Sequence, residues 1–151
     1  MSGIKSARML WGGIVHGSTV VVDSAPLIYV LENHPQFSAR FNGLFDAHAR
    51  GDVSIAVSTI TLAEVLTGPL RAGATALAKR YEQALLQFEM VSVSPAIATL
   101  SAALRVQYRL KIPDAIQLAT ALEIGASALV THDRDFANVT GITVLLGDIH
   151  V

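Results

Sequence analysis

Four acidic residues lie at the ends of apolar runs or in the first turn of the helix expected after such a run: Asp23, Glu64, Asp114 and Asp133. The carboxyl ends of parallel strands meet at one edge of a sheet, so acids far apart in the sequence are expected to come together there. Neighbouring carboxylates repel one another and are costly to bury. Because a bound divalent cation would offset that cost, the pattern predicts a metal site.

The first two acids also have purely structural explanations. Asp23 could cap the helix that follows it, although the neighbouring Ser24 could cap that helix equally well. Thr61 to Glu64 match the capping box, in which a glutamate bonds back to the backbone of a helix's N-cap residue. The local sequence therefore favours chemistry for Asp23 and leaves the two explanations of Glu64 about even.

The other two acids also need a choice between explanations. Asp114 follows Pro113 in the first turn of an expected helix, where the helix dipole favours a carboxylate, so taken alone it would be structural. Asp133 lies in the loop directly after an apolar run, and such loops often carry function. Asp135, two residues later, could be the acid that matters instead. Asp133 is favoured because it is nearer the end of the expected strand.

The elements that must position these acids alternate along the chain. Short apolar runs, most of them rich in β-branched residues, predict strands at residues 20–22, 53–57, 90–93, 128–130 and 142–146. Helical patterns cover residues 24–31, 36–50, 61–66, 72–88, 95–110 and 113–124, and Gly68-Pro69 is expected to end the third of them. This alternation predicts an α/β fold, a three-layer α/β/α sandwich with a central parallel five-stranded sheet.

Length and composition limit the class of protein. The 151 residues, of which 52% are hydrophobic and 15% charged, fit one globular domain. We expect that domain at residues 20–151, after an N-terminal arm or extra strand at residues 1–19. The mean hydropathy of +0.49 indicates either apolar surface left for a partner or a dimer, or simply a core rich in Ala and Val.

Charge and cysteine content exclude other classes. The net charge of −1 argues against a protein that binds nucleic acid through an overall positive field, so any nucleic acid must be bound locally. The sequence contains no apolar run of the length that a membrane span needs. The absence of cysteine excludes thiolate chemistry and agrees with a cytoplasmic location. Phosphate-binding glycine loops and the Gly-x-Ser-x-Gly elbow are also absent.

Four segments together resemble a known family, the PIN domain, and more narrowly the VapC-type toxin ribonucleases of bacterial toxin–antitoxin pairs. The segments are residues 20–29, 58–64, 110–115 and 129–136, and the resemblance extends over about residues 20–146. It implies an acidic cluster that holds Mg²⁺ or Mn²⁺ and cleaves single-stranded RNA. The family's acids fall on Asp23, Glu64, Asp114 and Asp133, and its hydroxyl positions fall on Ser24 and Thr131.

The resemblance also implies roles and partners. Asp23 and Asp114 are expected to bind the first metal, with Asp133 close by or bonded through water, while Glu64 holds a water molecule or helps to recruit a second metal. Lys111 is the best candidate for contact with RNA phosphate, together with Arg134. The expected partners are an RNA substrate, a cognate antitoxin protein and a second copy of the chain. Two alternatives stay open, a housekeeping RNA-processing nuclease and a catalytically silent binding module with the same fold.

Overall fold

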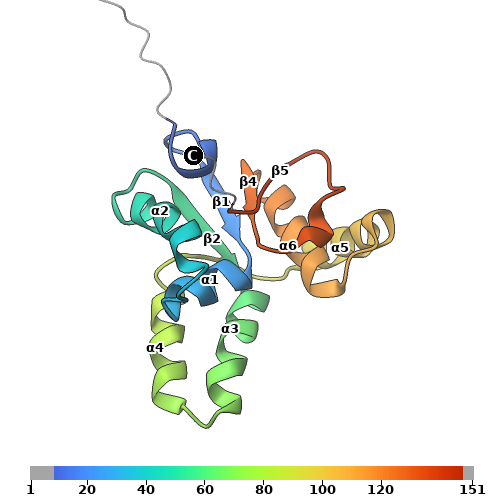
Figure 1. Cartoon of the computed structure of the whole chain (residues 1–151). Coiled ribbons are helices and arrows are strands. Elements are labelled where there is room, and N and C mark those ends of the chain that lie inside the picture. The colour runs from blue at the N-terminus through green and yellow to red at the C-terminus, as the bar shows by residue number, and fades with distance from the viewer. Residues whose placement is uncertain (1–8, 148–151) are drawn as a thin grey trace, which may run out of the picture.

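The computed structural model describes residues 9–147, and its centre is a five-stranded sheet in which every pair of neighbouring strands is parallel. The strands are β1 (Thr19–Val22), β2 (Ser54–Ser58), β3 (Glu89–Val91), β4 (Ala128–Val130) and β5 (Thr143–Leu145). Their order across the sheet is β3-β2-β1-β4-β5 (Figure 1). The predicted parallel five-stranded sheet is confirmed.

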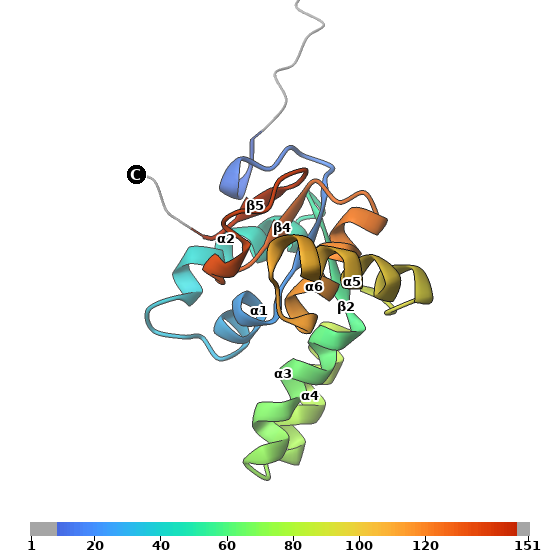
Figure 2. The same cartoon turned by 90° about the vertical axis from the view of Figure 1, so that its right-hand side faces the viewer.

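Helices cover both faces of this sheet. They are α1 (Ser24–Leu31), α2 (Ser38–Ala49), α3 (Thr59–Arg71), α4 (Thr75–Leu85), α5 (Pro95–Tyr108) and α6 (Ile112–Glu123), with short 3-10 turns η1 (Trp11–Gly13) and η2 (Arg134–Phe136). Helices α1 and α2 lie on one side of the strands, and α5 and α6 lie on the other (Figures 1 and 2). The result is the predicted three-layer α/β/α arrangement.

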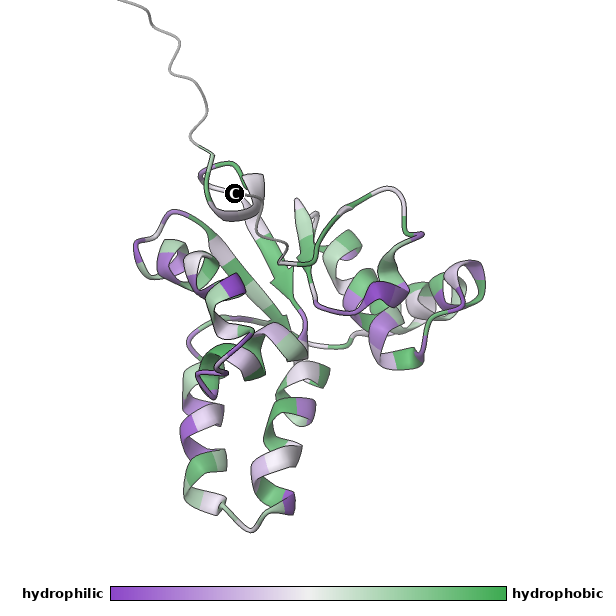
Figure 3. Ribbon diagram, viewed as in Figure 1, coloured by the Kyte–Doolittle hydropathy of each residue, from purple (hydrophilic) through white to green (hydrophobic). Residues whose placement is uncertain are grey.

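The central strand β1 shows why the layers form. Val20 and Val22 are fully buried in the core that includes α1 and α2, whereas Val21 is fully buried in the core that includes α5 and α6. Successive side chains of a strand point to opposite faces, so a continuous valine run suits a strand covered on both sides. Figure 3 shows this pattern as hydrophobic strands surrounded by helices whose colouring alternates.

The third helix is longer than predicted, and the expected stop at Gly68-Pro69 is wrong. Helix α3 continues to Arg71 with Pro69 inside it. A proline removes one backbone hydrogen bond from a helix interior. Here Pro69 is buried, and α3 packs against α4 along a hairpin that projects from the body of the molecule (Figure 1). Tertiary packing therefore overrides the local signal.

The described part of the predicted N-terminal arm packs on α2. Residues 9–18 contain η1 and an isolated antiparallel bridge between Met9 and Val15. The Trp11 indole N–H donates to the Arg40 carbonyl at 2.7 Å, and its ring lies 5.9 Å from that of Phe41. Residues 1–8 of the arm and 148–151 of the predicted domain lie outside the described range, and the boundary at residue 20 stays a prediction.

None of the described helices has the length and apolar content needed to cross a membrane.

Candidate metal centre

The site lies at the switch point of the sheet, between β1 and β4, where the order of the strands reverses. Strands β2 and β3 lie on one side of β1, and β4 and β5 lie on the other. Val22 pairs with Val130, so Asp23 and Thr131 follow the two strands side by side. The Asp23 N–H donates to the Val130 carbonyl at 2.8 Å. Ligands of parallel sheets bind at such a switch point, outside the carboxyl ends of the strands.

Asp23 is held by hydrogen bonds to both carboxylate oxygens. The Ser24 N–H donates to Oδ1 at 2.7 Å, and the Thr131 hydroxyl donates to Oδ2 at 2.8 Å. Asp23 is therefore the N-cap of α1, and the alternative in which Ser24 caps this helix is wrong. Burial raises the pKa of Asp23 and the nearby charges of Glu64 and Asp133 raise it further, while the two hydrogen bonds lower it.

Glu64 faces this centre from α3. The helix begins at Thr59, and the Ser58 hydroxyl caps it by accepting from the Ile60 N–H at 3.3 Å. Glu64 therefore lies in the second turn, so the capping box starting at Thr61 is wrong. Instead, the Ser24 hydroxyl donates to Glu64 Oε1 at 2.7 Å. The serine thus links the exposed Glu64 to the strand-end acid beside it.

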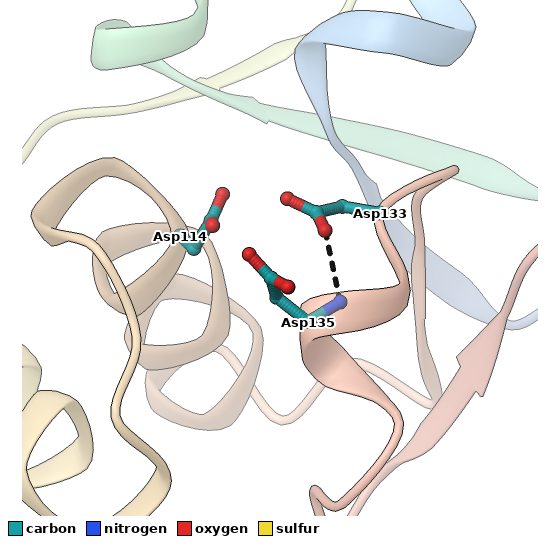
Figure 4. A group of neighbouring side chains, drawn as sticks. All are labelled: Asp114, Asp133 and Asp135. Carbon is teal, nitrogen blue, oxygen red and sulfur yellow. Dashed lines mark hydrogen bonds between the residues drawn. The ribbon is translucent and has the colours of Figure 1, made fainter.

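Three further carboxylates, those of Asp114, Asp133 and Asp135, come together near Asp23. Each offers an oxygen, and these oxygens all lie within 4.8 Å of one another (Figure 4). Asp114 comes from the first turn of α6 and the other two come from the loop after β4. Asp133 caps η2 by accepting from the Asp135 N–H at 2.9 Å, as the dashed line in Figure 4 shows.

The carboxyl group of Asp114 has a strongly raised pKa. Its pKa is raised from 3.8 to about 7, first by burial and then by the negative charge of Asp133. The charge of Asp23, a hydrogen bond with the Asp133 carboxyl and the charge of Asp135 add to the rise. A half-buried carboxyl group surrounded by other acids holds its proton, and a cation can replace that proton.

The sequence prediction had to choose between Asp133 and Asp135, and the structure brings both into the cluster. Asp133 is connected to Asp23 through Thr131. The Asp133 backbone N–H donates to the Thr131 hydroxyl at 3.1 Å, and that hydroxyl donates to Asp23. Asp135 is exposed. The two acids can therefore both contribute oxygens to one site.

The two predicted phosphate contacts flank these acids. Lys111 is the N-cap residue of α6, three positions before Asp114, and Arg134 lies between the two loop acids. Both side chains are exposed, and neither forms an ion pair with another described residue. Each leaves a positive charge available beside a strongly negative centre.

The donor set fits a hard divalent cation. Carboxylate oxygens suit Mg²⁺ and Mn²⁺, whereas Zn²⁺ is more often bound by His and Cys. Two oxygens that bind Mg²⁺ from opposite sides lie about 4 Å apart. Because the oxygens of Asp114, Asp133 and Asp135 lie within 4.8 Å of one another, small side-chain rotations would let them bind one ion.

Comparisons with known proteins show the family to which this fold belongs. The family model described as the PIN domain matches residues 20–142. A toxin–antitoxin complex from Klebsiella pneumoniae contains a chain that is 31% identical, with a TM-score of 0.69; the match covers 85% of this chain and 98% of that one. No curated protein sequence matches significantly.

Two more distant solved structures share the fold. VapBC2 from Rickettsia felis, bound to a DNA fragment from its promoter, is 19% identical with a TM-score of 0.68, over 83% of this chain and 96% of that one. VapC20 from Mycobacterium tuberculosis, a toxin that cleaves the sarcin–ricin loop, is 15% identical with a TM-score of 0.65, over 82% and 98%. The resemblance found in the sequence is therefore confirmed.

Proposed function

Because this chain belongs to the PIN domain family, we propose that it is a metal-dependent endoribonuclease, the toxin of a type II toxin–antitoxin pair. The observation that carries the proposal is the convergence of Asp114, Asp133 and Asp135. Asp23 is near enough for its charge to act on Asp114, and Glu64 is near enough for its charge to act on Asp23. Without a cation, the mutual repulsion of such carboxylates lowers the stability of the fold. A cation held there would meet an RNA phosphate that approaches from solvent.

The metal would be Mg²⁺ or Mn²⁺, held by Asp23, Asp114 and Asp133, with Asp135 as a further oxygen donor. When bound, it supplies a Lewis acid that neutralises phosphate charge and makes a coordinated water more acidic. Thr131 keeps the carboxylate of Asp23 oriented toward the site. Through Ser24, Glu64 is positioned to accept a proton from water or to recruit a second cation.

Lys111 and Arg134 would hold the RNA backbone. A negative site repels phosphate unless positive charge lies nearby, and these two side chains are the nearest to the acids in sequence. Removing one phosphate contact should weaken binding at all RNA sequences and make the dependence of affinity on salt less steep. Binding of a labelled single-stranded RNA to Lys111→Ala and Arg134→Ala proteins at several salt concentrations would measure this.

Cleavage of RNA by the purified protein is the direct test. Wild-type protein should cut single-stranded RNA in Mn²⁺ or Mg²⁺ and lose that activity in EDTA, and both Asp114→Asn and Asp23→Ala should abolish it. Asp46→Asn, which changes an exposed acid of α2, is the matched control and should cut at the wild-type rate. Cleavage by the Asp23→Ala protein at the wild-type rate would refute the assignment.

The toxin role requires a neutralising partner, and the relatives favour one. The solved complex from Klebsiella pneumoniae is a toxin–antitoxin complex, and its 31% identical chain is matched over 98% of its length. We propose that an antitoxin segment binds near the acidic site and the projecting α3–α4 hairpin, where Leu70 is 52% exposed. A small neighbouring gene whose product co-purifies with this chain would support the role, and its absence would favour RNA processing.

Two further expectations belong to the same proposal. The chain acts in the cytoplasm, where an RNA-cleaving toxin meets its substrate, and it forms a homodimer. Light scattering of the purified protein measures the second of these. A monomer at the concentrations used for cleavage would remove the dimer from the proposal while leaving the chemistry unchanged.

A further inference from the structure

We infer that Gln117 and Thr61 form a buried clamp that positions α3 and α6, the two helices that bring Glu64 and Asp114 to the metal centre. The inference rests on the proposed metal site. It assigns a positioning role to two uncharged residues that contact no reacting group. Neither residue belongs to the acidic cluster or to the hydroxyl groups that bond it.

The clamp is a hydrogen bond between distant parts of the chain. The Gln117 amide Nε2 of α6 donates to the Thr61 hydroxyl oxygen of α3, across 56 positions of sequence. Both side chains are fully buried. A buried bond of this kind fixes the separation and rotation of the two helices more firmly than apolar contacts, because its geometry is directional.

The bond lies one helical turn from each acid. Thr61 precedes Glu64 by three residues on α3, and Gln117 follows Asp114 by three residues on α6. Residues three apart share one face of a helix. A change in the Thr61–Gln117 bond therefore moves Glu64 and Asp114 relative to each other and to Asp23, which lies at the end of β1.

The acids on these helices repel one another, and the clamp opposes the movement that this repulsion favours. Asp23 is subject to the charges of both Glu64 and Asp133, and Asp114 to those of Asp23, Asp133 and Asp135. Without a cation this repulsion pushes apart the helices that carry the acids. A polar bond buried one turn below holds them at the spacing that a cation needs.

Stability alone does not account for Gln117. Its amide oxygen Oε1 is buried and has no hydrogen-bond partner among the described residues. An unsatisfied buried acceptor is costly, and an apolar side chain of similar size at this position would avoid that cost. A buried amide that leaves one acceptor unpaired yet ties together two acid-bearing helices is accounted for by the site it supports.

The test separates a positioning role from a structural one by replacing both partners. In the Thr61→Val/Gln117→Met double variant no buried polar group is left unpaired, so the melting temperature should equal or exceed that of the wild type. The dissociation constant for Mn²⁺, measured by titration calorimetry of the full chain without RNA, should rise about tenfold.

Two matched variants complete the experiment. Thr61→Ser keeps the hydroxyl and should bind Mn²⁺ as the wild type does. Thr120→Val removes another buried threonine hydroxyl of α6, one that donates to the Ile116 carbonyl of its own helix, and it should also leave Mn²⁺ affinity unchanged.

Either of two results overturns the clamp while leaving the proposed function in place. One is wild-type Mn²⁺ affinity in the double variant. The other is a weakening in Thr120→Val as large as that in the double variant. If the wild-type protein itself binds no Mn²⁺, the proposed metal site fails, and the clamp fails with it.

Discussion

Replacing Asp114 with Asn should stabilise the metal-free protein at pH 8 and remove its response to Mn²⁺. Burial and the neighbouring acids raise the pKa of Asp114 to about 7. At pH 8 this carboxyl group is therefore ionised in unfavourable surroundings, which lowers the free energy of unfolding. Asparagine keeps the shape of the side chain and removes its charge.

The size of the effect follows from the pKa. A rise from 3.8 to about 7 sets an upper limit of about 4 kcal/mol, at about 1.4 kcal/mol for each tenfold change in acidity. The side chain is only half-buried, so solvent screening reduces this to about 1–2 kcal/mol. For a chain of 151 residues, this corresponds to a melting temperature higher by about 3–6 °C.

The sign depends on pH. Because the folded-state pKa of Asp114 is raised, its contribution to stability is fully present below pH 3.8 and is lost as the pH rises to about 7. The advantage of asparagine should therefore be near zero at pH 4, should grow between pH 4 and pH 7, and should be constant above that. Thermal unfolding in EDTA at pH 4, 6 and 8 measures it.

Adding Mn²⁺ should reverse the order of the two proteins. A cation that binds the folded state at 100 times its dissociation constant stabilises it by about 2.7 kcal/mol, and the variant lacks a central oxygen donor. Asp46→Asn is the matched control, since it changes an exposed acid of α2. The reasoning is refuted if Asp114→Asn is less stable than wild type at pH 8 in EDTA, or if Mn²⁺ stabilises both proteins equally.

Three further substitutions test other parts of the structure. Ser24→Ala removes the donor to Glu64 and should slow RNA cleavage in Mn²⁺ about tenfold at an unchanged melting temperature; a wild-type rate would contradict this. Gly43→Ala places a Cβ 2.9 Å from Trp11 and should lower stability to urea by about 1–3 kcal/mol, unless residues 9–18 are dispensable. Arg109→Gly relieves a positive φ of 56° and should raise stability by about 1 kcal/mol in thermal unfolding, whereas a loss would show that its side chain contributes.

The sequence predicts the sheet well because its signals are local. Each strand lies within a residue or two of its apolar run, and the all-parallel arrangement follows from the alternation of strands and helices. The positions of Asp23 and Asp133 follow from the same rule, since each comes after a parallel strand, whereas Asp114 reaches them from the first turn of α6, which follows helix α5. Burial of Val20 to Val22 on both faces keeps that edge in place.

Helix boundaries near the site are less predictable because packing decides them. Ser58, at the end of β2, caps α3, so the helix begins at Thr59 and Glu64 falls in its second turn rather than in a capping box. Pro69 is accommodated because α3 packs against α4. Either shift changes which face a side chain occupies, and local sequence carries no signal for the packing that causes it.

The side-chain network was also beyond local reasoning. The choice between Asp133 and Asp135 depends on how η2 turns, and the 3-10 turn brings both into one cluster. Gln117 carries a signal that sequence reasoning did not use. It is a polar residue in a largely apolar stretch, three positions after a site acid. Such a pattern indicates a buried hydrogen bond to another helix that carries a site acid.

Asp23 and Asp114 differ in how the protein holds them before a cation binds. Burial raises the pKa of Asp23, and the hydrogen bonds that its two oxygens accept from Ser24 and Thr131 offset part of that rise. Asp23 is therefore oriented before any cation arrives. Asp114 accepts no such bonds from neighbouring donors among the described residues, and its pKa is raised to about 7, so its surroundings favour the charged form only when a cation is present. Cation binding must then release the Asp114 proton, so affinity for Mn²⁺ falls as the pH drops below 7.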